Sequence, residues 1–282
     1  MSKAVSIAKE LAGEFKKDHA TTLAAAQAYY YLLAIVPLLI LLLAILPYLQ
    51  LDPNRVMDFI GTILPGEVAN TFEDTIVSVV TTPSGGLLTF GILGTLWSAS
   101  NAMTAFIEAT NQAYDVEESR SFIKLKGTAI ILTLFMLVAV IIALVLPIFG
   151  GAIIDSISSF LNLPSQTEII FQVLRWVISI AVMSIVLAFL YKFAPNKHFP
   201  FKEVIIGAVI ATVLWQVVSL GFSFYVANFG SYSATYGSLG GLIVLMLWFF
   251  LTGLILVIGA EINAILHRRK NVKNAPAQVY EE

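Results

Sequence analysis

The feature that most constrains the fold is an uncharged apolar run from Leu239 to Ala260, which reads LGGLIVLMLWFFLTGLILVIGA. As an α-helix, these 22 residues would extend about 33 Å, which is enough to cross the hydrocarbon core of a bilayer. Glu261 and Asn263 follow, and then a basic cluster at residues 267–270. Because cations are retained on the cytoplasmic side of membranes, the run predicts a transmembrane helix with one carboxylate, Glu261, near its cytoplasmic end.

The composition extends this prediction to the whole chain. Of its 282 residues, 58% are hydrophobic and 12% are charged, whereas soluble proteins carry about 25% charged residues. The net charge of −2 argues against a nucleic-acid-binding protein, which would need a basic surface. The chain has no cysteine, which excludes disulfides, thiolate catalysis and cysteine metal sites. We therefore expect an all-α, polytopic membrane protein without a cofactor.

Hydropathy and helix breakers divide the chain into six predicted spans. Residues 1–20 are predicted to form a cytoplasmic amphipathic helix, and residues 269–282 a disordered cytoplasmic tail. Residues 21–268 would then form one membrane domain, with two short amphipathic helices at the outer interface within residues 48–84. The predicted spans are approximately residues 22–46, 85–114, 127–149, 169–193, 204–228 and 238–266.

The distribution of cations predicts the orientation of these spans. Six spans place both termini on the same side of the membrane. Every Lys and Arg except Arg55 and Arg175 falls in the N-terminal arm, the second loop, the fourth loop or the C-terminal tail. The positive-inside rule therefore predicts that both termini are cytoplasmic.

The second predicted span is the least lipid-like. Its small and polar residues recur at spacings of three and four, so they share one helix face. A long polar face exposed to hydrocarbon is too costly, so this face should contact other helices or water. The face on the second span comprises Gly91, Gly94, Ser98, Asn101, Thr104, Glu108 and Asn111.

The fifth span carries Gln216 on a face of small residues, which is typical of helix packing.

Three charged residues, Glu108, Arg175 and Glu261, lie inside predicted spans rather than at their ends. A charged residue there raises the free energy of membrane insertion by about 2.5–3.5 kcal/mol, so each of the three is expected to have a structural or functional role. Glu108 and Glu261 are expected at similar depth, where a shared cavity could carry protons, bind a cation or contact a cationic headgroup. Alternatively, each satisfies neighbouring polar groups or reaches cytoplasmic water. Arg175 is expected nearer the outer leaflet, where it could snorkel, pair with Glu168 or bind a phosphate group.

No pattern typical of a hydrolytic enzyme is present in the sequence. The three histidines, His19, His198 and His267, are isolated from one another in predicted cytoplasmic segments. The sequence contains no HxxxH or HxH metal spacing, no GxSxG motif and no P-loop lysine motif. We therefore expect neither an enzyme nor a metal site, and no catalytic residue is assigned.

Several stretches resemble the YihY/virulence factor BrkB family, over about residues 5–268. They are AAAQAYYYLLAIVPLLILLLAIL, LWSASNAMTAFIEATNQAYDVEESRSFIKLKGTAIILT, LYKFAPN and YGSLGGLIVLMLWFFLTGLILVIGAEINA. The resemblance implies a six-helix protein of the bacterial plasma (inner) membrane. Members have been labelled ribonuclease BN, but nothing in this sequence could build a nuclease site. The positions that match recurrent motifs are Trp97, Asn101, Asn111, Tyr236, Gly237, Trp248, Gly259, Glu261 and Asn263.

The resemblance also implies a link to export of envelope lipids or their precursors, to serum resistance and to cation/proton antiport. Three functions stay open: a transporter of a lipid or amphiphilic envelope component, a cation/proton antiporter using Glu108 and Glu261, or a non-transporting scaffold for envelope assembly. Membrane lipids are the expected partners and nucleic acid is not, with a second copy of the chain or another envelope protein as an open alternative. The candidate cavity residues are Ser98, Asn101, Thr104, Glu108, Asn111, Arg175, Gln216, Glu261 and Asn263.

Overall fold

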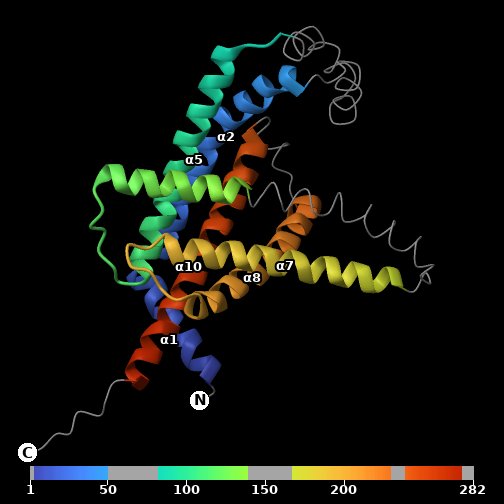
Figure 1. Cartoon of the computed structure of the whole chain (residues 1–282). Helices are drawn as coiled ribbons and strands as arrows, with labels where there is room; N and C mark the ends of the chain where they lie inside the picture. The colour runs from blue at the N-terminus through green and yellow to red at the C-terminus, as the bar shows by residue number, and fades with distance from the viewer. Residues whose placement is uncertain (1–2, 50–81, 139–166, 230–238, 275–282) are drawn as a thin grey trace, which may run out of the picture. The chain divides into compact units, whose positions relative to one another are not determined.

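The computed structural model describes residues 3–49, 82–138, 167–229 and 239–274, which form helices joined by short connections (Figure 1). No β-strand occurs among these residues, which confirms the predicted all-α fold. Residues 122–138 are helical, and a 3₁₀ turn at Leu46–Leu49 follows α2. The remaining helices are α1 (Lys3–Lys17), α2 (Ala20–Ile45), α5 (Gly85–Ala113), α7 (Thr167–Phe193), α8 (Phe201–Phe229) and α10 (Leu239–Asn274).

Three of the described helices are long and apolar enough to cross a membrane. The candidate spans are Ala20–Leu38, Phe201–Asn228 and Gly240–Lys270. Within the described part of α7, Val177–Phe193 is apolar but shorter. A membrane protein with helical spans is thus supported, and the number of six spans stays a prediction.

The described helices lie close to the predicted ones, including α1 within residues 1–20. Other predicted segments lie outside the described residues. These are the short amphipathic helices expected between the first two spans, the end of the third span at residues 139–149, and residues 275–282 of the predicted tail. The first part of that tail, residues 269–274, is helical rather than disordered, because α10 continues past the predicted end of the sixth span to Asn274.

Local sequence explains where several helices begin and end. Ser84 caps α5, because its hydroxyl accepts a hydrogen bond from the backbone N–H of Leu87 at 3.4 Å. His19 and Asp115 follow α1 and α5 and have φ angles of 50° and 52°. A left-handed residue of this kind cannot continue a helix, so it ends the helix before it and turns the chain. The turn after α5 places the carboxylate of Asp115 2.9 Å from Arg268 of α10 and 2.9 Å from Lys17 at the end of α1.

The chain forms two compact units, which are described separately. The larger unit comprises residues 1–29 and 102–282, and the smaller unit comprises residues 30–101. The boundaries fall inside α2 and α5, so each of these helices contributes to both units.

The core of the larger unit is built from α7, α8 and α10 together with the C-terminal part of α5 and the helical residues 122–138, and α1 lies against α10 (Figure 1). Helices α8 and α10 meet where Gly207 approaches the backbone of Gly259 so closely that any side chain on Gly207 would overlap it. Small residues at such a contact let membrane helices pack with their backbones close together. Tyr191 of α7 covers this contact, and its buried hydroxyl donates a hydrogen bond to the Leu256 carbonyl at 2.8 Å.

Candidate functional site

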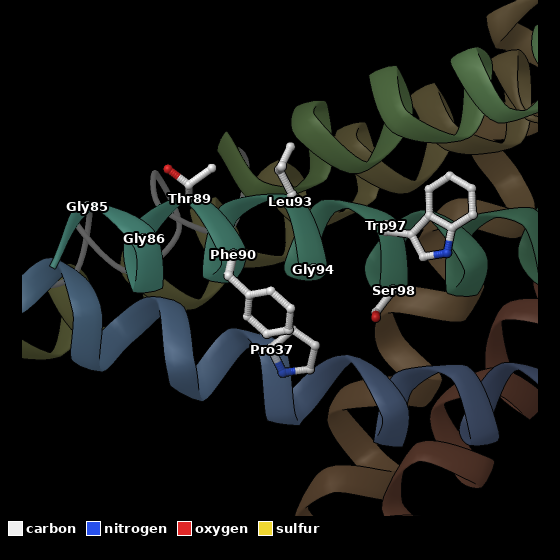
Figure 2. A pocket seen from close by; sticks show the side chains of 9 residues that line it. All are labelled: Pro37, Gly85, Gly86, Thr89, Phe90, Leu93, Gly94, Trp97 and Ser98. Carbon is white, nitrogen blue, oxygen red and sulfur yellow. The ribbon is translucent and has the colours of Figure 1, made fainter.

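The smaller unit contains an open hollow of about 980 Å³ between α5 and Pro37 of α2. Figure 2 shows the Phe90 ring beside Pro37 and the Ser98 hydroxyl directed toward α2. Phe90, Leu93 and Trp97 are 62%, 62% and 56% exposed, so the hollow presents large apolar surfaces. Its lining residues are Pro37, Gly85, Gly86, Thr89, Phe90, Leu93, Gly94, Trp97 and Ser98.

Glycines on α5 set the shape of this hollow. A Cβ atom on Gly91 would lie 2.8 Å from the Leu41 Cα, and one on Gly94 would lie 3.3 Å from the Pro37 Cβ. Helices α2 and α5 therefore touch along these glycines. Pro37 has no backbone N–H, so one carbonyl a turn earlier in α2 loses its helical donor. The result is an apolar surface with a few polar groups, which suits an amphiphile better than an ion.

A second hollow, of about 440 Å³, lies in the larger unit and is lined largely by acids and amides. Glu108 is exposed there, at the end of α5. Acidic and amide side chains of this kind could attract cations to the surface. The lining residues are Glu108, Asn111, Gln112, Asp115, Val116, Glu117 and Glu118.

Asn111 is buried, and its amide bonds to two other segments of the larger unit. Its Nδ2 donates to Glu118 Oε2 at 2.8 Å, and its Oδ1 accepts the Asn196 backbone N–H at 2.7 Å. Asn196 in turn donates to the carbonyl of Glu117 and to the hydroxyl of Ser119. Asn111 therefore joins the end of α5 to the following loop and to the α7–α8 connection.

Glu118 is fixed by a two-point ion pair. Arg120 donates from Nε to Glu118 Oε1 at 2.8 Å and from Nη2 to Oε2 at 2.6 Å. The same guanidinium group donates to the Ala194 carbonyl at 3.0 Å. The Arg120 hydrogen bonds hold the pKa of the Glu118 carboxyl below its usual range.

Replacing Glu118 by Gln should destabilise the protein at neutral pH, and this loss should fade in acid. The folded-state pKa lies below the ordinary value of 4.5, so the charged pair contributes stability above that value. This contribution is lost as pH falls through the lowered pKa. Thermal unfolding of wild type and Glu118→Gln in detergent should therefore separate near neutral pH and converge in acid. Glu117→Gln, at an exposed neighbour, is the matched control; an equal gap at both pH values would contradict the prediction.

Glu261 lies in the larger unit beside two acids, Glu14 in the last turn of α1 and Asp18 directly after this helix. One carboxylate oxygen from each of the three lies within 4.8 Å of the others. Glu261 is fully buried, and neither of its carboxylate oxygens has a hydrogen-bond partner among the described residues. Glu108 instead lines the acidic hollow, to which Glu261 does not contribute. The structure thus groups Glu261 with Glu14 and Asp18, and it places Glu108 in the acidic hollow.

Sequence reasoning missed Glu14 and Asp18, although a signal was present. The two acids are four residues apart in an amphipathic pattern that predicts a helix, and residues with this spacing project from the same helix face. They come directly before the first span, where an amphipathic helix can return against the ends of other helices.

Asn263 is fully buried in α10 and is hydrogen-bonded to the backbone of α8. Its Oδ1 accepts the Gly207 N–H at 2.7 Å, and its Nδ2 donates to the Val204 carbonyl at 3.0 Å. This geometry joins two helices and leaves neither end of the amide facing a cavity.

The remaining candidates are dispersed. Ser98 lines the apolar hollow, whereas Asn101 and Thr104 are partly buried further along α5. Gln216 is partly buried on α8. Arg175 belongs to α7, but its side chain lies outside the described part of the structure. The smaller unit thus contains an apolar hollow, and the larger unit contains an acidic hollow and a buried carboxylate cluster, which are linked by the hydrogen bond from Gln112 to Asp18.

Comparison with known proteins agrees with this architecture. The virulence factor BrkB family matches residues 11–281. A Bacillus subtilis (strain 168) protein, YfkH, which carries a ribonuclease-like name, is 42% identical over 95% of this chain and 98% of its own length. A UPF0761 membrane protein of Vibrio vulnificus (strain CMCP6) is 29% identical over 96% of this chain and 85% of its own length. No solved structure matches the chain. With helices able to span a membrane and a match over nearly its whole length, the chain belongs to the virulence factor BrkB family of integral membrane proteins.

Proposed function

We propose that this protein is a transporter, and not an enzyme, that moves a lipid or another amphiphilic envelope component. The observation that carries the proposal is the open hollow on α5. Its volume of about 980 Å³ would hold a large part of an acyl chain or an isoprenoid tail. The exposed Phe90, Leu93 and Trp97 provide apolar surface, and Thr89 and Ser98 provide hydroxyl groups for a polar head.

The proposed topology has six spans in the bacterial inner membrane, with both termini in the cytoplasm. Its support is the gathering of Lys and Arg in alternate loops and at the chain ends. In this topology α5 enters the membrane from the outer side at Gly85. The hollow, which begins at Gly85, would then face the outer half of the bilayer. Lipids of that leaflet, rather than nucleic acid or soluble metabolites, are the partners that fit such a surface.

Cation/proton antiport is a second candidate function, and the burial of Glu261 favours it. A carboxylate inside a helical span that is buried without a hydrogen-bond donor among the described residues is a common device for carrying protons or cations. The exposed Glu108 in the acidic hollow could serve as an entry point at the surface.

Filling the hollow should slow lipid reorientation. Gly86 lines the hollow, and a Cβ atom there would meet nothing within 4 Å among the described residues, so Gly86→Trp should fold normally. The measurement uses proteoliposomes that contain a fluorescent phospholipid, with dithionite bleaching of the outer leaflet. We expect fast bleaching of the inner-leaflet probe with wild type and a several-fold slower rate with Gly86→Trp.

Gly241→Trp is the matched control, because Gly241 is equally open but does not line the hollow. It should reorient lipid at the wild-type rate. If folded wild type moves no lipid beyond the rate of empty vesicles, lipid transport is excluded. Dissipation of a sodium or proton gradient by the same vesicles, abolished in Glu261→Gln, would then support antiport.

A further inference from the structure

The buried carboxylate cluster of Glu14, Asp18 and Glu261 has too few hydrogen-bond donors and cations around it to balance its negative charge. Asp18 and Glu261 are 1% and 0% exposed. Neither oxygen of Glu261, nor Oδ2 of Asp18, has a hydrogen-bond partner among the described residues. A buried carboxylate without donors is strongly unfavourable, so the geometry requires a species that is positively charged or donates hydrogen bonds.

The two cations near the cluster, Arg268 and Lys17, contact Glu14 at its partly buried edge and Asp115 outside it. Arg268 lies 3.3 Å from Glu14 and 2.9 Å from Asp115. Lys17 also bonds to Glu14 and Asp115, at 3.3 and 2.9 Å, and is 4.0 Å from Asp18. Three acids, Glu14, Asp18 and Asp115, thus share two bases, and no ion pair to Glu261 is found in the described residues. With Glu261 included, four carboxylates stand against two bases, so the charge balance leaves room for two further positive charges.

The positions of the carboxylate oxygens fit a metal ion. One oxygen from each acid lies within 4.8 Å of the others. Two oxygens on opposite sides of a calcium ion are about 4.6–5.2 Å apart, and those on a magnesium ion about 4.2 Å. Hard divalent cations prefer carboxylate oxygens, so three such ligands can hold one ion with water completing its shell.

The surroundings hold these ligands in place. Glu14 lies in the last turn of α1 and Asp18 directly follows the helix, with its backbone N–H donating to the Glu14 carbonyl at 2.8 Å, and the left-handed His19 then turns the chain. Gln112, at the end of α5, donates to Asp18 Oδ1 at 3.2 Å. A second residue that orients a ligand in this way is typical of metal sites.

We propose that Glu14, Asp18 and Glu261 bind a divalent cation of the calcium or magnesium class, which fastens α1 to the end of α10. The site joins residues from opposite ends of the sequence. A bound ion would therefore stabilise the docking of the N-terminal helix. The inference does not depend on which substrate the protein transports.

The test is titration of CaCl₂ and MgCl₂ into the full chain, purified in detergent and stripped with EDTA, by isothermal calorimetry. Wild type should bind one ion per chain in a saturable manner. Glu261→Gln should bind at least about tenfold more weakly, because it removes a direct ligand. Glu10→Gln, an acid on the same helix that pairs with Arg269 outside the cluster, should bind as wild type does. Absence of saturable binding by wild type, or equal weakening in both variants, would overturn the proposal.

Thermal unfolding provides a second readout. In EDTA, Glu261→Gln should be at least as stable as wild type, because it removes one of three mutually repelling carboxylates. In saturating CaCl₂ the order should reverse, because only wild type gains from binding. If Glu261→Gln fails to fold, Glu14→Gln, at the partly buried rim of the cluster, replaces it in both experiments. Stability that responds to acid but not to either cation would indicate a proton shared between Asp18 and Glu261, and would refute the metal site.

Discussion

Alanine at Gly207 or Gly259 is expected to destabilise the protein by about 2 kcal/mol or more. At Gly207, the new Cβ would overlap the carbonyl oxygen of Gly259 and lie 2.5 Å from Oδ1 of Asn263. At Gly259, it would overlap the hydroxyl of Tyr191 and lie 2.9 Å from the Cβ of Ala211. The Gly259 carbonyl belongs to a helix backbone and cannot rotate aside. Helices α8 and α10 would therefore have to separate, and Gly207→Ala should be the more severe change.

The same two helices supply matched controls. Gly221 on α8 and Gly241 on α10 have open space, with nothing described within 4 Å of a new Cβ. Alanine at these positions should be neutral, or stabilising by up to about 1 kcal/mol, because alanine is the better helix former. Thermal unfolding of all four variants in detergent, monitored by circular dichroism, should give lower unfolding temperatures for the alanine variants of Gly207 and Gly259 than for those of Gly221 and Gly241. Similar unfolding temperatures for all four would show that the helices do not cross at Gly207 and Gly259.

The helices could be predicted from the sequence because their signal is local. An uncharged run such as Leu239–Ala260 specifies a helix by its length. The observed α5 and α10 begin within one residue of the expected positions. No knowledge of neighbouring helices was needed for these inferences, since backbone hydrogen bonds in a membrane must be satisfied within each helix.

The roles of polar residues were harder to predict, because they depend on contacts distant in sequence. The face on α5 was one pattern in the sequence, yet its members have different surroundings: Gly94 packs on Pro37, Ser98 lines the hollow and Asn111 bonds to Asn196. Periodicity identifies a shared face but not the partner of each residue.

Glu261 illustrates the same limit. Its burial was expected from its place in a span, but its neighbours Glu14 and Asp18 are about 240 residues earlier in the chain. The expectation that Glu108 and Glu261 lie at similar depth assumes that the spans are parallel, and it considers only residues within the spans. It omits the amphipathic α1 and the turn after it, which contribute Glu14 and Asp18 from outside the predicted spans.

Asn263→Asp is expected to be among the most destabilising single changes in the chain, by about 3–5 kcal/mol. The amide donates to the Val204 carbonyl at 3.0 Å and accepts from the Gly207 N–H at 2.7 Å. An aspartate keeps the acceptor but sets a second oxygen against the Val204 carbonyl, with a buried charge that has no counter-ion there. Asn263→Ala should cost less, about 1–3 kcal/mol, because it removes both bonds without adding a charge. Equal stability of the two variants would show that the Asn263 amide does not donate to the Val204 carbonyl.

A double-mutant cycle distinguishes this bonding role from a role in a cavity. A Cβ on Gly207 would press against the Asn263 side chain, so Asn263→Ala should relieve part of the strain introduced by Gly207→Ala. The double variant should therefore be less destabilised than the sum of the single variants, by about 0.5 kcal/mol or more. Relief should be incomplete, because the Gly259 carbonyl still opposes the new methyl group. Strict additivity in unfolding free energy would mean that Asn263 does not lie in the α8–α10 contact, and would return it to the candidates for a transport cavity.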